Sequence, residues 1–147
     1  MVRQPVLVCL DASVLVAAAH SPACGSALIL EVCRGHRFKA TVSIRIIQEA
    51  RLNISEKFPE EDLVRFYQQL ARLEPEIVPP AAAERLAQCA TIVKEKDAHV
   101  LAAALECGAG YLLTLDKKHL LTSSVQSSGL PLRVMTPGDF LKEITSS

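Results

Sequence analysis

Short apolar runs alternate along this chain with longer stretches of helical periodicity. Val6–Leu10 is a continuous apolar run, typical of a strand that is covered on both faces. Four later segments are also predicted strands: residues 38–42, Glu76–Val78, residues 111–115 and residues 132–135. Because strands and helices alternate, we expect a three-layer α/β domain with a mostly parallel central sheet and helices on both faces.

Between the predicted strands, apolar residues recur every three or four positions, which indicates helices that bury one face. Ser43 is suited to cap the helix that follows it, and Pro137 to stand in the first turn of the last helix. The predicted helices cover residues 12–19, a segment through residues 28–33 that stops near Gly35, residues 44–54, Glu60–Leu73, residues 81–94, an Ala-rich segment from Asp97 to Gly108, and a closing segment from Thr136. The Ser-rich residues 122–128 are predicted to form an exposed loop. No repeat or long linker divides the chain, so we expect residues 1–147 to form one domain.

The composition limits the kinds of partner that the chain can bind. Half of the residues are apolar and 22% are charged, as in globular domains. Only 4% are aromatic, so an aromatic platform for stacked bases is not expected. The formal net charge is zero, which argues against a broad polyanion-binding surface. Contact with a nucleic acid would have to come from local clusters such as Lys94 with Lys96 or Lys117 with Lys118, from metal ions, or from a second subunit.

The five cysteines form neither a Cys-x-x-Cys pair nor a regular pattern. Their odd number and apolar surroundings argue against a disulfide framework or a zinc site and favour buried thiols in a reducing compartment. The apolar runs near the N-terminus are too short for a secretion signal, and no segment approaches the ~20 apolar residues of a membrane span. We therefore expect a cytoplasmic protein with no membrane association.

Acidic residues stand at positions where an α/β sheet binds its ligands. Asp11 directly follows the first predicted strand, Asp116 directly follows residues 111–115, and Asp97 begins a helix. Ligands of open α/β sheets bind at the carboxyl ends of the strands, so these three acids could share one crevice. Glu49 lies within a helix and would join them only if that helix lines the crevice. Clustered carboxylates need a cation, and oxygen ligands favour Mg²⁺ or Mn²⁺.

Each of these acids also has an ordinary structural explanation. Asp is among the best residues for capping a helix N-terminus, so Asp11, Asp97 and Asp116 could each be only a cap. A helical Glu such as Glu49 is most often simply exposed. Ser13 and Thr114 are, individually, ordinary capping or strand residues. Spacing alone therefore does not establish a site.

Four motifs around these acids resemble the PIN-domain family. The sequence Leu-Asp-Ala-Ser at residues 10–13 looks like its opening motif, and Gln48-Glu49 looks like its second acid on a helix. Residues 96–104 are similar to the third acid with its Ala-rich helix, and Thr114-Leu115-Asp116 looks like the closing Thr-x-Asp motif. The order and spacing of these motifs match the family across nearly the whole chain, and residues 136–141 also look like the corresponding part of the family.

The resemblance implies a Rossmann-like sheet and a ribonuclease that hydrolyses RNA phosphodiester bonds with Mg²⁺ or Mn²⁺. The metal ligands, direct or through water, would be Asp11, Glu49, Asp97 and Asp116, with a metal-bound water attacking the phosphorus in line. Ser13 and Thr114 would be supporting hydrogen-bonders, although many relatives carry Asn in place of Ser13. The resemblance is closest to VapC-type toxins, which are held inactive by a partner antitoxin and commonly form homodimers.

Other functions remain open at this stage. A haloacid-dehalogenase-like phosphatase would need an Asp where this chain has Ser13, and a receiver module would need a Lys after the last strand, where none stands. A dinucleotide-binding enzyme would need a glycine-rich turn after the first strand, and this chain has none there. These three functions are therefore less favoured. The remaining alternative is a non-catalytic RNA- or protein-binding scaffold with the same fold. The histidines are not required as bases beside a metal, so we interpret them as structural or surface residues: His20, His36, His99 and His119.

Overall fold

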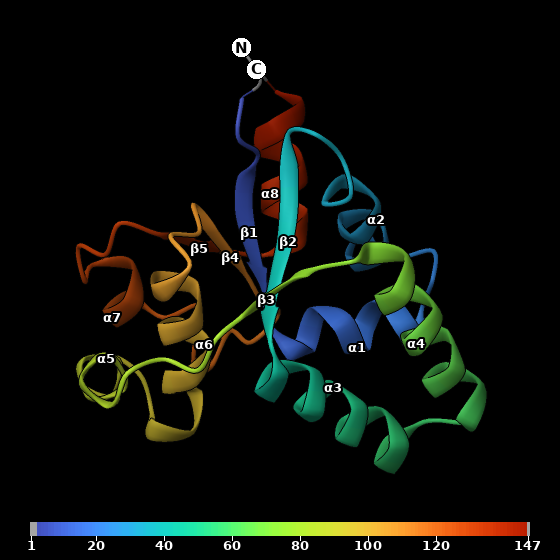
Figure 1. Ribbon diagram of the computed structural model, residues 1–147, viewed down its shortest axis with the longest axis horizontal. Coiled ribbons are helices and arrows are strands. Elements are labelled where there is room, and N and C mark those ends of the chain that lie inside the picture. Colours follow the sequence, from blue (N-terminus) through green and yellow to red (C-terminus); the bar gives the residue numbers. More distant parts are fainter. Residues whose placement is uncertain (1–2, 147) are drawn as a thin grey trace.

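The computed structural model describes residues 3–146 and contains a sheet of five strands (Figure 1). The strands are β1 (Val6–Leu10), β2 (Phe38–Ser43), β3 (Glu76–Val78), β4 (Tyr111–Leu113) and β5 (Arg133–Met135). Their order across the sheet is β3-β2-β1-β4-β5. Every neighbouring pair is parallel, which confirms the predicted type of sheet.

Helices cover both faces of this sheet. They are α1 (Ala12–His20), α2 (Gly25–Val32), α3 (Ile44–Lys57), α4 (Glu60–Leu73), α5 (Ala83–Ala90), α6 (Glu95–Glu106), α7 (Ser123–Gln126) and α8 (Pro137–Thr145). Figure 1 shows α5, α6 and α7 on one side of the sheet and α1, α2 and α4 on the other. The expected three-layer α/β arrangement is therefore confirmed.

The Ala-rich helix α6 is the innermost helix of its layer. It packs against β1, β2 and β4, and its residues 98–104 are all buried. Small Ala side chains allow the backbone of α6 to approach the sheet closely, while Val100 and Leu101 fill the space between them. This close packing fixes the start of α6, and thus Asp97, relative to the strand ends.

Local signals at the helix ends explain where several elements begin. The Ser43 hydroxyl accepts a hydrogen bond from the Ile46 N–H at 3.1 Å, so Ser43 caps α3 as predicted. Thr136 caps α8 in the same way, through the N–H of Asp139, and Pro137 follows it in the first turn. These caps place α3 and α8 directly after β2 and β5.

Several predicted boundaries differ from the structure, and α6 begins at Glu95 rather than at Asp97. Helix α5 covers only Ala83–Ala90, because a tight turn in which Thr91 bonds the carbonyl of Gln88 ends it early. Strand β4 ends at Leu113 rather than at residue 115. The predicted loop at residues 122–128 is wrong in part, since Thr122 caps the short helix α7 and Val125 is buried.

All five cysteines are free, in agreement with the prediction of unpaired thiols. Burial raises the pKa of the thiols of Cys9 and Cys33 to about 12. Within residues 3–146, no single helix is long and apolar enough to cross a membrane, although α1 and α2 together, bent by 111°, meet that test by length and composition.

We predict that Glu74→Gly stabilises the fold. Glu74 ends α4 in the left-handed region, with φ 47° and ψ 57°, and it directly precedes Pro75. A side chain is disfavoured there, so glycine should raise the free energy of unfolding by about 0.5–1 kcal/mol, measured by urea denaturation. The control is Glu76→Gly in β3, where glycine should lower stability by about as much. An equal loss of unfolding free energy in the two variants would show that the backbone at Glu74 is not strained.

Candidate active site

The candidate site begins where the connections of the sheet change direction. Strand β1 lies between β2 and β4. The chain adds β2 and β3 on one side of β1, and then crosses to add β4 and β5 on the other side. Ligands of open α/β sheets bind at such a switch point, outside the carboxyl ends of the strands. Leu10 and Leu113 are register partners at the ends of β1 and β4, so Asp11 and Thr114 leave the sheet side by side.

Two hydroxyl groups hold the carboxylate of Asp11. Ser13 Oγ and Thr114 Oγ1 each donate a hydrogen bond to Asp11 Oδ2, both at 2.8 Å. Each hydroxyl also accepts a backbone N–H from the loop after β4: Leu115 N–H bonds Ser13 at 3.0 Å, and Asp116 N–H bonds Thr114 at 3.0 Å. The two hydroxyls therefore join Asp11 to the loop that carries Asp116.

Asp11 stands at the N-cap position of α1, but its side chain does not cap the helix. The residue is 7% exposed, so its carboxylate is held almost out of solvent. Both hydroxyl bonds use Oδ2, and no described residue donates to Oδ1. The simple capping explanation is therefore wrong for the side chain of Asp11.

Asp116 is bound to its own loop. Its Oδ1 accepts the backbone N–H groups of Lys118 and His119 at 3.1 and 3.0 Å, and its Oδ2 lies 3.1 Å from Nδ1 of His119. Burial alone would raise the pKa of Asp116, but the hydrogen bonds from the His119 ring and from the two N–H groups outweigh it and hold this pKa below its ordinary value. The alternative of a local turn cap therefore describes part of what Asp116 does.

Glu49 is tied to α6 by a histidine that sequence reasoning did not place in the site. Glu49 Oε1 lies 2.7 Å from Nε2 of His99, whose ring is 7% exposed. Arg45, one turn before Glu49 on α3, approaches the same oxygen at 4.0 Å. The sequence signal for His99 was its position two residues after Asp97 in the Ala-rich helix, which made nearness to the site possible without indicating a role.

Asp97 lies in the first turn of α6, where Lys94 rather than Asp97 occupies the N-cap position. Its Oδ2 is buried and has no hydrogen-bond partner among the described residues. A buried carboxylate oxygen without a partner is costly, unless a cation or a proton satisfies it. Asp97 is two residues before His99, so the same end of α6 carries both Asp97 and the partner of Glu49.

The four acids thus fall into two groups. Asp11 and Asp116 are linked through Thr114, and Glu49 is linked through His99 to the end of α6 that carries Asp97. Among residues 3–146, no three His, Cys, Asp or Glu side chains are close enough to hold one ion as they stand. A single site built from Asp11, Glu49, Asp97 and Asp116 therefore stays a prediction.

The available oxygens nevertheless suit a hard divalent cation. Asp97 Oδ2 lacks a partner, and Asp11 Oδ1 receives no hydrogen bond from the described residues. Carboxylate oxygens without a nearby sulfur ligand favour Mg²⁺ or Mn²⁺ over softer metals. The donor set fits the expected ions.

We predict that Thr114→Val destabilises the fold by about 1–3 kcal/mol, because it removes a donor to the buried Asp11 and the acceptor of the Asp116 N–H. The matched control is Thr41→Val. Thr41 is equally buried, and its hydroxyl lies 3.6 Å from Cys107 Sγ and bonds no carboxylate among the described residues. Urea denaturation of both variants measures the difference. Equal losses would show that Thr114 contributes no more than an ordinary buried hydroxyl.

Several solved structures have a similar fold. The VapBC2 complex from Rickettsia felis, bound to a DNA fragment from its promoter, is 17% identical with a TM-score of 0.66, covering 87% of this chain and 96% of that chain. A toxin–antitoxin complex from Klebsiella pneumoniae is 17% identical with a TM-score of 0.61, covering 88% and 97%. VapC20 from Mycobacterium tuberculosis, a toxin that cleaves the sarcin-ricin loop, is 14% identical with a TM-score of 0.53, covering 86% and 98%. At such identities these likenesses show the fold.

The family itself follows from the sequence. Among curated proteins, none matches this chain. Residues 7–118, which include all four acids, match the family model described as PIN domain. Because that match spans most of the chain and agrees with the observed sheet, the chain belongs to the PIN-domain family.

Proposed function

We propose that this protein is a Mg²⁺- or Mn²⁺-dependent endoribonuclease. The observation that carries the proposal is the buried, unpartnered Oδ2 of Asp97 at the start of α6. A divalent cation would satisfy this oxygen, and ligands of open α/β sheets bind near the carboxyl ends of the strands. Membership of the PIN-domain family and the ribonuclease among its structural relatives support the reaction class.

The residues of the chain would act as follows. Asp11, Glu49, Asp97 and Asp116 hold the ion, directly or through water. A bound ion supplies an activated water and neutralises charge on the phosphodiester. Ser13 and Thr114 fix the carboxylate of Asp11, and His99 fixes that of Glu49.

Exposed cations next to the acids would bind the RNA backbone. Lys96 precedes Asp97, and Lys117 and Lys118 follow Asp116. All three are exposed, so their ammonium groups can reach a phosphate. A local set of this kind is compatible with a net charge of zero.

We further propose that the chain is the toxin of a toxin–antitoxin pair, inhibited by an antitoxin protein and active as a homodimer. The similar folds of a toxin–antitoxin complex and of a toxin that cleaves RNA favour this role. The second candidate function is a non-catalytic PIN-domain scaffold. It is favoured by the absence, within residues 3–146, of three acids close enough to share an ion.

We predict that Asp97→Asn abolishes both RNA cleavage and stabilisation by Mn²⁺. A ligand present at 100 times its Kd should stabilise the wild type by about 2.7 kcal/mol, seen as a rise in Tm. The variant should show no rise and should cleave a mixed RNA substrate at least ~100-fold more slowly, because the ion is no longer held. The matched control is Glu95→Gln, an exposed acid in the same turn of α6, which should behave as wild type. An unchanged Tm of the wild type with Mn²⁺ would favour the scaffold.

We also predict that His99 supports Mn²⁺ binding through Glu49. His99→Leu should weaken Mn²⁺ binding about 10-fold to 100-fold, the range found when the hydrogen-bond partner of a metal ligand is removed. His99→Gln keeps a donor and should retain most of the affinity. Titration calorimetry with Mn²⁺ measures both variants. A similar loss of Mn²⁺ affinity in the two variants would show that His99 acts through packing and does not orient Glu49.

A further inference from the structure

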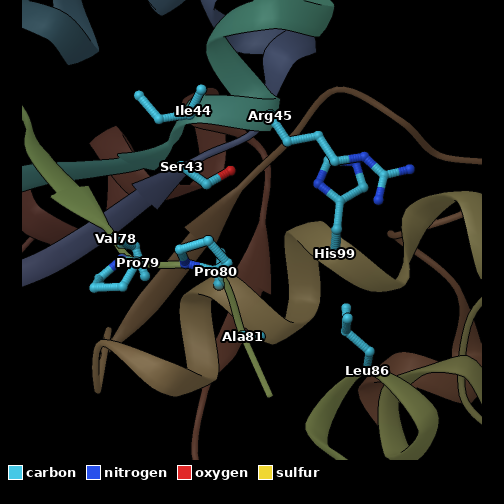
Figure 2. Close-up of a pocket in the computed structure, with 10 residues that line it drawn as sticks. Ser43, Ile44, Arg45, Val78, Pro79, Pro80, Ala81, Leu86 and His99 are labelled. Carbon is cyan, nitrogen blue, oxygen red and sulfur yellow. The ribbon is translucent and has the colours of Figure 1, made fainter. Parts of the chain in front are cut away.

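A small cavity lies directly beside the candidate site. Its volume is about 160 Å³. Its walls come from the β2–α3 junction at Ser43, from residues 78–81 after β3, from Leu86 of α5, and from His99 and Ala103 of α6. Figure 2 shows the two prolines Pro79 and Pro80 beneath Ser43, with the His99 ring and Leu86 on the other side of the view.

Two side chains of the cavity wall contact one of the acids, Glu49. His99 lines the cavity and at the same time bonds Glu49 at 2.7 Å. Arg45 also lines the cavity, and its Nε lies 4.0 Å from Glu49 Oε1. A group held in the cavity would therefore lie close to the Glu49 side of the candidate site.

The volume suits one aromatic ring. Pockets for drug-sized ligands measure roughly 300–1,000 Å³, whereas an apolar cavity of about 150 Å³ holds benzene. A cavity of about 160 Å³ is therefore matched to a single six-membered ring and is small for a fused pair of rings. In an RNA strand, that ring is a pyrimidine base.

The hydroxyl group of Ser43 on the cavity wall is available to donate a hydrogen bond. Ser43 is 9% exposed, and its Oγ accepts the N–H of Ile46. Its own hydroxyl hydrogen has no acceptor within the described part of the chain. A donor on a wall that is mostly apolar apart from Arg45 and His99 favours a ring with a carbonyl oxygen, which both uracil and cytosine carry.

The rim of the cavity carries positive charge. The side chain of Arg45 is 59% exposed, and Arg45 and Lys96 line the wider hollow that adjoins the cavity over α5 and α6, together with one acid, Glu95. A guanidinium group in that place can bind a phosphate of the strand while the base enters the cavity. Charge, volume and the free donor point to the same ligand.

We propose that this cavity is the subsite for a pyrimidine base of the RNA strand, one nucleotide from the phosphodiester that is cleaved. The proposal rests on the proposed ribonuclease function and adds a base preference to it. The apolar walls exclude water from the ring, Ser43 donates to a ring carbonyl, and Arg45 holds the adjoining phosphate.

The test is nucleotide binding without a metal ion, which separates the subsite from the chemistry. Wild-type protein in EDTA is titrated with uridine 5′-monophosphate and with adenosine 5′-monophosphate, and binding is followed by NMR chemical shifts. We expect the uridine nucleotide to bind about tenfold more tightly, the ratio that one additional hydrogen bond provides.

Ala103→Leu is the variant that fills the cavity, because Ala103 is 3% exposed and lines it. It should lose uridine nucleotide binding at least ~tenfold. The control Ala87→Leu adds the same volume in the neighbouring hollow and should bind as wild type. If Ala103→Leu does not fold, Leu86→Phe at the half-buried edge of the cavity replaces it.

Equal affinity for the two nucleotides, or unchanged uridine nucleotide binding in the cavity-filling variant, would overturn the subsite. Selective binding in EDTA together with no RNA cleavage in Mn²⁺ would support the subsite while refuting the nuclease. Cleavage without a pyrimidine preference would refute the subsite alone. A cavity that binds neither nucleotide but is covered by a protein partner would also overturn the proposal.

Discussion

The buried carboxylate of Asp11 is the constraint around which the candidate site is organised. A charged group that is 7% exposed needs hydrogen-bond donors, and Ser13 and Thr114 provide them from two elements that meet only in the folded chain. Each hydroxyl oxygen also accepts a hydrogen bond from a backbone N–H of the loop after β4. Satisfying one buried charge therefore also fixes the loop that carries Asp116.

The other half of the site depends on how closely α6 lies on the sheet. Its small residues allow that approach, and the helix start then presents Asp97 with an unpartnered oxygen and His99 with its bond to Glu49. Uncompensated carboxylates raise the free energy of the folded state, and a divalent cation is the partner that such oxygens favour. The same packing leaves the small cavity beside His99, which both lines the cavity and bonds Glu49.

Much of the fold could be predicted because β1 is a continuous apolar run and the longer helices carry apolar residues at helical spacing. Val6–Leu10, Glu76–Val78 and Glu60–Leu73 were predicted with the bounds that the structure shows, and Ser43 caps its helix as expected. Residues 122–128 were predicted as a loop because Ser is common in loops, and burial of Val125 was not visible in a polar stretch. The end of α5 was missed because a local turn at Thr91 outweighs the helical periodicity.

The sequence by itself determined the order of elements, the parallel sheet and the positions of the acids at strand and helix ends, because each of these follows from local patterns of apolar and capping residues. Only the tertiary structure decided which partners those acids have. Ser13 and Thr114 are 101 residues apart and converge on Asp11, and Glu49 and His99, 50 residues apart, meet across two helices. Such contacts depend on the register between β1 and β4 and on the depth at which α6 packs, and neither quantity is encoded in local spacing.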